Sequence, residues 1–423
     1  MKSSGASSQC TQNLNDQWSL RALHLVLMNI TEVLAHELAH PTEAAPEWSQ
    51  MEWAVARAVA SIHGVSPLLA GTLRWQGPDG WSQFLAQQRA HTAARFDRIR
   101  ELLQQIDQAA AAAEVALLAL KGAALYANGV YAPGERPMAD VDLLVRKIDV
   151  LRTARLLEAL GFRTTLRSNR HITFDRDVAG SPAPLGEHCG NAIKIELHCA
   201  IRELLPLKAV EISEMIFPGD ARPGLNAYSS STALLVHLLL HAAGAMSVRE
   251  LRLLHLHDIS RLTRSMSEAA WERMFQEAET ATGAGESALW WAFPPLTLVS
   301  RYFGGVPRKV LSRTGGACHW LLRRACRDKT LSSSSISYLW ISAFPAMYWA
   351  RSTREMLQYA TARLVPTRET REQRRELAKT QPRVSGGAWA ELSQSRRLLR
   401  WVLSRQPRHA TLQPVYAALQ AAS

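Results

Sequence analysis

The sequence predicts an α+β fold: a small mixed β-sheet core with its helices, flanked by helical regions on the N-terminal and C-terminal sides. Two observations favour it. Apolar residues recur at helical spacing from about residue 17 to 110 and again from about residue 229. Between these regions, short apolar runs of strand length alternate with short helical segments, which is typical of an α/β core.

Changes in this pattern divide the chain into five segments. Residues 1–16 form a polar leader that we expect to be disordered. This leader lacks the apolar stretch of a signal peptide. Residues 17–113 form the N-terminal helical region and residues 114–228 the α/β core. Residues 229–365 form a C-terminal helical domain, and residues 366–423 form a basic charged tail with a terminal helix.

In the N-terminal region, the apolar spacing predicts three helices. They cover residues 51–62, a segment starting at residue 66, and roughly residues 81–113. Ser66-Pro67 restarts the second helix, and a Gly-Pro turn at residues 77–80 precedes the third.

In the core, an apolar strand over residues 115–120 ends abruptly at Lys121-Gly122 and leads into a short helix over residues 123–128. Alternation of polar and apolar residues predicts the next strand over residues 140–145. The remaining core elements are expected to be a helix over residues 148–160 and strands over residues 162–166, 171–174 and 192–201.

The C-terminal region is expected to be helical, starting at an N-cap offered by Ser231 or Thr232. Its longest apolar run, residues 336–350, is too short for a bilayer span and contains Pro345. We expect a buried helix there, with membrane-surface contact as the alternative, and no transmembrane segment. A last amphipathic helix is expected over residues 389–403.

The charge of the chain is unevenly distributed. A net charge of +12 favours anionic partners such as nucleotides or nucleic acid. Residues 361–409 hold 12 Lys and Arg against 4 Asp and Glu, so most of the excess lies there and the core is nearly balanced. The five cysteines are too irregularly spaced for a disulfide framework, and a cytoplasmic location fits them.

The pair Asp140 and Asp142 on the predicted strand carries the first chemical signal. Side chains alternate along a strand, so both aspartates point to one face with Cα atoms roughly 6–7 Å apart. Two carboxylates at this spacing can bracket hard cations such as Mg²⁺, which phosphoryl and nucleotidyl transfer require. Taken alone, this short pattern also fits a solvated strand end.

Two neighbouring features strengthen the metal hypothesis. Lys121-Gly122 follows the apolar strand at a helix start, where backbone N–H groups favour phosphate. Glu196 lies in the middle of an apolar strand, and a buried glutamate is costly unless it is paired or coordinated. It could complete a carboxylate triad with Asp140 and Asp142.

At this point the chain resembles a little-characterised nucleotidyltransferase family of the DNA-polymerase-β-like superfamily. The resemblance is carried by LKGAAL at residues 120–125, GERPMADVDLLV at residues 134–145, Gly161-Phe162, and IELH at residues 195–198. Weaker matches extend it over roughly residues 50–375.

The resemblance implies roles for individual residues. Asp140 and Asp142 would be metal ligands, and Glu196 would be the third carboxylate, which could also accept the proton of the acceptor hydroxyl. Lys121-Gly122 stands where relatives carry Gly-Gly or Gly-Ser and should contact the triphosphate. Arg136 would contact phosphate oxygens; alternatively it is a loop arginine paired with Glu135 or with a helix end.

The expected activity is magnesium-dependent transfer of a nucleoside monophosphate from an NTP to an acceptor hydroxyl, with Mn²⁺ as the alternative ion. ATP is the default donor. The acceptor is not readable: a small molecule, a peptide, a protein side chain or an RNA end all fit, although nucleic acid is not favoured.

Three other interpretations compete with this one. His188-Cys189 and His198-Cys199 offer zinc ligand types, but neighbours on a strand face opposite ways, which favours a loop residue for Cys189 and a small core residue for Cys199. His237, His241 and His257-Asp258 suggest a metal phosphohydrolase of the HD type, although core histidines explain them as well. The basic tail suggests a non-catalytic module binding nucleotide or RNA, whereas its interleaved glutamates favour a solvated helix with i, i+4 pairs.

Overall fold

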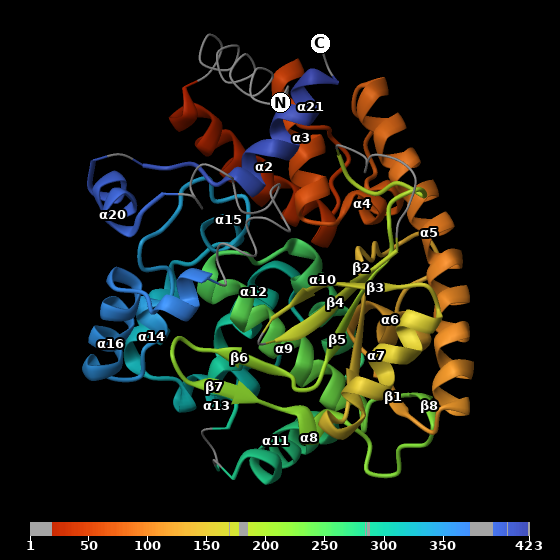
Figure 1. Ribbon diagram of the computed structural model, residues 1–423. Helices are drawn as coiled ribbons and strands as arrows, with labels where there is room; N and C mark the ends of the chain where they lie inside the picture. The colour runs from red at the N-terminus through yellow and green to blue at the C-terminus, as the bar shows by residue number, and fades with distance from the viewer. Residues whose placement is uncertain are drawn as a thin grey trace.

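The computed structural model describes residues 19–168, 170–176, 185–283, 285, 288–372, 392–403 and 405–421. The leader expected over residues 1–16 lies outside these residues. In the described part, a six-stranded sheet lies between a long helix on one side and a large helical body on the other, as expected for an α+β fold (Figure 1).

The N-terminal helices are α2 (Leu20–Ala39), α3 (Gln50–Ile62), α4 (Ser66–Thr72) and α5 (Asp79–Ala112). The last three follow the predicted boundaries closely, and α2 lies in the region expected to be helical without predicted bounds of its own. Helix α3 starts with a capping box in which Ser49 and Glu52 bond to each other's backbone, and Pro67 lies in the first turn of α4. The N-terminal region is therefore helical, as predicted.

The sheet contains β1 (Ala116–Ala119), β2 (Asp140–Val145), β3 (Arg163–Arg167), β4 (His171–Asp175), β5 (Lys194–His198) and β8 (Gly224–Asn226). Their spatial order is β3-β4-β5-β2-β1-β8. Strands β2 and β5 run parallel, as do β1 and β8, and the other neighbours are antiparallel. The five predicted strands are confirmed. Strand β8 and the separate hairpin β6 (Arg202–Leu204)–β7 (Ala209–Glu211) were not predicted.

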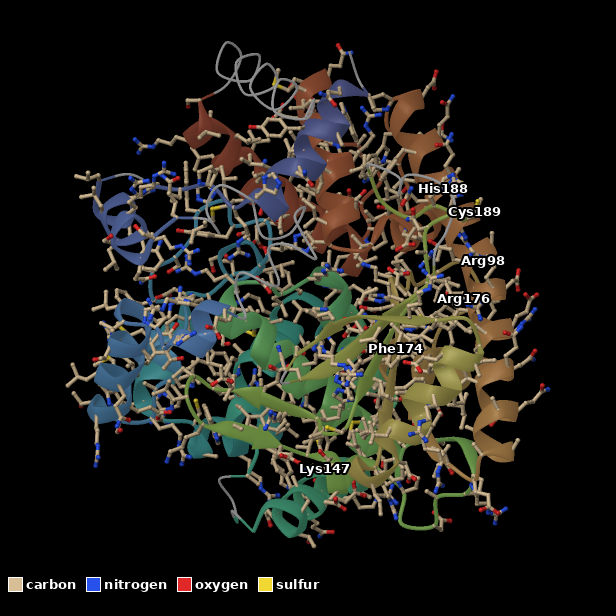
Figure 2. All side chains as sticks on the ribbon, in the orientation of Figure 1. Arg98, Lys147, Phe174, Arg176, His188 and Cys189 are labelled. Carbon is tan, nitrogen blue, oxygen red and sulfur yellow. The ribbon has the colours of Figure 1, made fainter. Side chains whose placement is uncertain are left out.

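The two faces of the sheet pack against different helices. Val141, Leu143 and Val145 of β2 join a core with α5 and with α7 (Val150–Ala159). Phe174 of β4 is fully buried in the same core (Figure 2). The opposite face belongs to the core of the helical body, through Leu118 of β1 and Leu144 of β2. A short helix, α6 (Lys121–Ala127), follows β1 directly.

The helical body is built from many short helices. They are α8 (Ser213–Ile216), α9 (Ser231–Val248), α10 (Leu253–Thr263), α11 (Glu268–Thr282), α12 (Phe293–Phe303), α13 (Arg308–Ala317), α14 (Trp320–Arg327), α15 (Leu331–Ser334) and α16 (Thr353–Leu364). Helix α9 contacts α10, α11, α12 and β6, which explains why it is apolar on every side.

Two helices, α2 and α9, are long and apolar enough to cross a membrane by length and composition, and the bent pair α3–α4 would count as a third if taken as one span. In the described structure, 50% of the apolar window of α2 and 78% of that of α9 is buried against other parts of the protein. The absence of a transmembrane segment stays a prediction.

The helix predicted over residues 336–350 is wrong. This segment is irregular, with a single 3₁₀ turn, η4 (Met347–Trp349). Its backbone groups bond to other segments instead: Ile341 N–H donates to the carbonyl of Gln406 at 2.8 Å, and Trp340 pairs with Pro407 as an isolated bridge. The burial was predicted correctly, since Leu339 and Trp349 have no exposed surface.

The end of the chain returns to the N-terminal helices. The amphipathic helix predicted over residues 389–403 is observed as α20 (Gln394–Leu403), and the part before residue 392 lies outside the described residues. A further helix, α21 (His409–Gln420), packs along α3, and Arg57 Nη2 donates to the carbonyl of Ala418 at 3.4 Å (Figure 1). Helix α21 of the tail thus contributes side chains to the main hydrophobic core.

We expect Leu412→Ala in α21 to lower the free energy of unfolding by about 2–4 kcal/mol, because this leucine is only 7% exposed within the main core. The matched control is Leu403→Ala, whose side chain is 72% exposed in α20 and should change stability by less than about 0.5 kcal/mol. Urea denaturation measures both. Equal, small effects would show that α21 does not pack as described.

Candidate active site

The parallel pair β2 and β5 brings the three candidate acids to one face of the sheet. Asp142 lies opposite Glu196, and Asp140 lies opposite Lys194. Residues opposite each other in neighbouring strands point to the same side, and Asp140 shares that side because it is two residues from Asp142. Glu196 therefore lies beside the aspartate pair, on the face that turns toward the helical body.

The ammonium group of Lys121 lies among these carboxylates. Its Nζ is 3.0 Å from Asp142 Oδ1, and 19% of its side chain is exposed. Burial alone would lower the pKa of Lys121, but Asp142, Asp140 and Glu196 together raise it above its ordinary value. Lys121 thus supplies positive charge to the acid cluster.

The backbone of Lys121 is held in an unusual shape. Its φ of +47° lies in the left-handed region, which is costly for a residue with a side chain. Its N–H donates to the hydroxyl of Tyr228 at 3.2 Å, and that hydroxyl is 2.7 Å from Nδ1 of His237. The turn between β1 and α6 is therefore fixed by its surroundings, as is common where a side chain must be positioned.

Two histidines complete the cluster, and neither was predicted as a site residue. His198 Nε2 is 3.0 Å from the same Asp142 oxygen that Lys121 contacts. His171 lies opposite His198 on β4, with its Nε2 3.6 Å from Glu196 Oε1. The spacing of Glu196 and His198 was the available signal, because residues two apart on a strand share a face.

The charges in the cluster do not balance. Burial would raise the pKa of Asp142, but Lys121 and His198 hold it well below its usual range. Burial, followed by the charge of Asp142, raises the pKa of Asp140. Burial and the two aspartates raise the pKa of Glu196 to about 8. Asp142 is therefore stabilised in its ionised form, whereas burial and the neighbouring acids oppose ionisation of Asp140 and Glu196 more strongly than Lys121 and the nearby arginines favour it.

This imbalance fits a divalent cation. Carboxylate oxygens are the ligands that Mg²⁺ prefers, and the two nearby imidazoles are also compatible with Mn²⁺. The register of β2 and β5 sets Asp140, Asp142 and Glu196 on one face of the sheet, but the ligand atoms there that lie within 4.8 Å of one another are, among the described residues, those of His171, Glu196 and His198. The roles of Asp140, Asp142 and Glu196 as metal ligands and catalytic residues stay a prediction.

Arg136 makes a buried ion pair with Asp258 of α10. Its Nε and Nη2 atoms are 2.9 and 2.7 Å from the two carboxylate oxygens, and both side chains are at least nine-tenths buried. Tyr131 donates its hydroxyl to the same aspartate at 2.8 Å. Neither Glu135 nor a helix end is the partner of Arg136. Its guanidinium is largely committed to Asp258, so a phosphate contact would use the remaining nitrogen, Nη1.

The side chain of Arg136 leaves room only for a glycine at position 122. A Cβ atom on Gly122 would lie 2.3 Å from Arg136 Nη1 and 2.8 Å from the side chain of Met138. Any larger residue would push Arg136 away from the start of α6. The predicted triphosphate contact of Lys121-Gly122 therefore has Arg136 Nη1 as its immediate neighbour.

The acid cluster opens into a cavity of about 1500 Å³. Its walls include α9, α10, the hairpin strand β6 and the terminal helix α21, through residues such as His241, Arg202 and Gln413. Ligand sites for one small molecule usually measure about 300–1,000 Å³, so this cavity has room for two.

Arg252 is a cavity residue that the sequence did not single out. Its charge lowers the pKa of Asp140, although burial dominates that carboxyl and raises it. The side chain is exposed, and within the described residues it makes no ion pair. It is a cation free to meet an anionic ligand.

The competing metal sites are not assembled as the sequence suggested. Among the described residues, the side-chain groups that could hold a metal ion are His171, Glu196 and His198, and a second group at His91, His188 and Cys189. Neither combines His188-Cys189 with His198-Cys199. The prediction of a core position for Cys199 is wrong: it is exposed, because β5 ends at His198. Cys189 lies in a loop, as predicted.

The phosphohydrolase hypothesis gains no support from the geometry. His237 contacts Tyr228, His257 Nδ1 is 2.8 Å from the Tyr131 hydroxyl, and Asp258 is bound to Arg136. His241 faces Glu203 at 4.0 Å. In the part of the chain that is described, these residues form no common metal site.

The tail supports the solvated-helix interpretation where it is described. Arg368 and Glu372 form an exposed i, i+4 pair at 2.8 Å. The basic residues between 373 and 391 all lie outside the described residues.

Comparison with known proteins gives one match. A family model described as uncharacterised nucleotidyltransferase matches residues 49–285, more than half of the chain. No curated protein and no solved structure matches the chain significantly. The matched region contains every acid of the cluster, but it ends before α12 and α21.

We expect Glu196→Gln to stabilise the metal-free protein at high pH. A folded-state pKa of about 8, above the usual 4.5, means that folding disfavours the ionised form. The penalty is absent below pH 4.5, grows as pH rises, and is complete above pH 8, at roughly 1.4 kcal/mol for each unit of pKa difference. Thermal unfolding in chelator should show a higher Tm for the variant at pH 8.5 and equal Tm values at the lowest pH where both fold.

Asp258→Asn should destabilise the protein by about 3 kcal/mol or more, because it leaves the charge of Arg136 buried without a counter-ion. Its control is Glu135→Gln at a neighbouring, half-buried carboxyl that accepts the N–H of Ala132; the amide oxygen of Gln can keep that bond, so we expect a change below about 0.5 kcal/mol. If denaturation gives similar values for the two, the pairing of Arg136 with Asp258 is refuted.

Proposed function

Because this chain belongs to the uncharacterised nucleotidyltransferase family, we propose that it transfers a nucleoside monophosphate from an NTP, ATP by default, to a hydroxyl group of an acceptor. The observation that carries the proposal is the register of β2 and β5, which sets Glu196 beside Asp142 and Asp140 on one face of the sheet. The acceptor is a small molecule, a peptide or a protein.

Asp140, Asp142 and Glu196 would hold Mg²⁺, with Mn²⁺ as the alternative. When bound, the metal supplies Lewis-acid stabilisation of the attacking and leaving oxygens. The cluster favours such binding because burial and the neighbouring carboxylates raise the pKa of Asp140 and Glu196, and a cation at their oxygens would offset that cost.

We expect Lys121 to pair with Asp142 in the metal-free protein and with the triphosphate when metal is bound. Without metal, its ammonium group neutralises Asp142 at 3.0 Å. A divalent ion at the same carboxylates would compete for that position, and the ammonium is then free to contact the triphosphate. Lys121 would neutralise charge that develops on the leaving pyrophosphate, which is the main contribution a protein makes to this chemistry.

Two arginines would assist. Arg252 is exposed in the cavity without an ion pair among the described residues, so it can approach the triphosphate. Arg136 offers only Nη1, beside Gly122, because Asp258 holds the rest of its guanidinium. We therefore expect Arg136 mainly to position the turn at Lys121-Gly122.

The acceptor would enter from the helical side of the cavity. Its hydroxyl oxygen bonds to the α-phosphorus as the bond to the pyrophosphate oxygen breaks, and its proton passes to the carboxylate of Glu196. The walls formed by α9, β6 and α21 would then surround the acceptor.

The test is incubation of the full chain with each α-³²P-labelled NTP and Mg²⁺ or Mn²⁺, with and without extract of the source cells. We expect label to appear on an acceptor with release of pyrophosphate, and Asp140→Asn to reduce this at least about 100-fold, since removing one charge-stabilising group typically costs that much.

The matched control is Asp97→Asn, an exposed aspartate on α5 that forms an ion pair with Arg100, which should retain full activity. Nucleotide binding that depends on Asp140 with no labelled product from any donor would instead indicate the non-catalytic module. Equal labelling by Asp140→Asn and the unaltered chain would refute the proposed site.

A further inference from the structure

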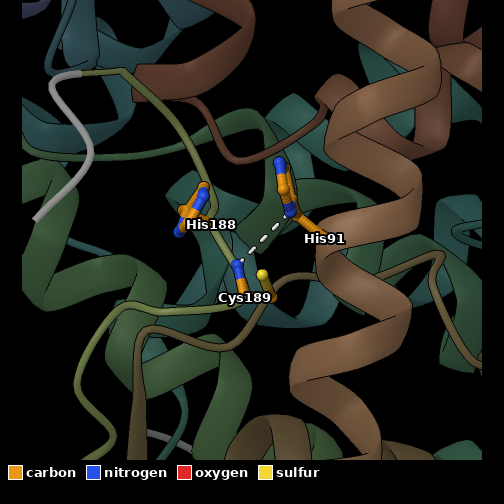
Figure 3. Close-up of side chains that lie close together, drawn as sticks. All are labelled: His91, His188 and Cys189. Carbon is orange, nitrogen blue, oxygen red and sulfur yellow. Dashed lines mark hydrogen bonds between the residues drawn. The ribbon is translucent and has the colours of Figure 1, made fainter.

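A second group of potential metal ligands lies outside the acid cluster. His91 on α5 faces His188 and Cys189 from the loop between β4 and β5 (Figures 2 and 3). The ligand atoms of the three side chains all lie within 4.8 Å of one another, and the two imidazole rings are 4.5 Å apart between centroids. Cys189 carries a free thiol.

The loop carrying His188 and Cys189 is fixed to α5 by several other bonds. Gln88 Oε1 accepts a hydrogen bond from the backbone N–H of Glu187 at 2.7 Å, and Gln88 Nε2 donates to the backbone carbonyl of Glu187 at 3.1 Å. Arg95 forms an ion pair with Glu187 at 2.8 Å, and Arg98 donates to the carbonyl of Cys189. These bonds hold the backbone of the loop against α5, and this places the three potential ligands close together.

We propose that His91, His188 and Cys189 bind a zinc ion that fastens the β4–β5 loop to α5. Two imidazoles and one thiolate form a donor set that suits Zn²⁺ better than Mg²⁺ or Ca²⁺, which prefer oxygen. Water completes the tetrahedron, because His188 is exposed and solvent reaches the group. On binding, the thiol of Cys189 releases its proton to solvent as the sulfur–zinc bond forms.

The geometry needs only a small adjustment. Ligand atoms around tetrahedral zinc are about 3.3–3.7 Å apart, given bond lengths of about 2.0 Å to nitrogen and 2.3 Å to sulfur. A separation of at most 4.8 Å contracts to this value by rotation of side chains. The three side chains lie close together where the loop meets α5 (Figure 3).

Metal binding would replace two weak interactions. Nδ1 of His91 accepts the N–H of Cys189 at 3.4 Å, so its lone pair already points at the cysteine (Figure 3). Nδ1 of His188 accepts the N–H of Gly190 at 3.0 Å, and that bond is lost if the ring binds zinc. A neutral hydrogen bond contributes far less to stability than a bound structural zinc ion, so the exchange favours the metal.

The site would act on the acid cluster through Arg95. This arginine lies one helical turn after His91 on α5, and it donates to the carbonyls of Asn191 at 2.6 Å and Met138 at 3.0 Å. The first of these carbonyls leads into β5, which carries Glu196, and the second precedes β2, which carries Asp140. Zinc at His91 would stiffen the common support of both strands.

The test uses the full-length, reduced, metal-free protein titrated with Co²⁺, followed by displacement with Zn²⁺. We expect an ultraviolet thiolate-to-cobalt charge-transfer band that saturates at one equivalent and disappears on addition of zinc. The same band must be absent in Cys189→Ser, and His91→Gln must weaken cobalt binding at least about 10-fold. Zinc should raise the Tm of the unaltered protein but not that of Cys189→Ser.

Two controls separate this site from others in the chain. Cys199→Ser, which removes an exposed thiol elsewhere, must keep the band. Glu196→Gln must also keep it, because the acid cluster offers no thiolate. A band that survives in Cys189→Ser, or no band in the unaltered protein whose circular dichroism shows it to be folded, overturns the proposal.

Discussion

The arrangement of the candidate site depends on the parallel register of β2 and β5, which sets Asp142 beside Glu196 and places Asp140 on the same face of the sheet. Lys121 lies among these carboxylates, with its Nζ 3.0 Å from Asp142. Burial and the neighbouring acids raise the pKa of both Asp140 and Glu196. A strained turn at Lys121 is tolerated because Tyr228 and the surrounding core hold it.

Much of the acid cluster could be predicted from the sequence, because strand alternation and apolar flanks determine which side chains share a face. The histidines were missed for a simpler reason. His171 reaches the site only through the pairing of β4 with β5, and a register between strands separated in sequence cannot be read from composition. The partner of Arg136 was missed in the same way, since Asp258 is 122 residues away.

The fold outside the cluster shows where periodicity fails. Helices with one apolar stripe, such as α3, begin and end as predicted. Residues 336–350 are apolar enough for a buried helix, yet their backbone bonds go to residues 406 and 407. Cys189 lies in a loop as predicted, but its neighbourhood with His91 of α5 could not be seen in the sequence. Contacts between distant segments decided the last two cases.

The terminal helix has a consequence for how such a protein diversifies. The acids and Lys121 belong to a region shared with a whole family, whereas α21, which closes the far wall of the cavity, lies beyond it. Under the proposed function, a change in α21 would alter the shape of the cavity while the acids and Lys121 stay in place. The fit of the acceptor and the reacting groups would then depend on different stretches of one polypeptide, each able to vary separately.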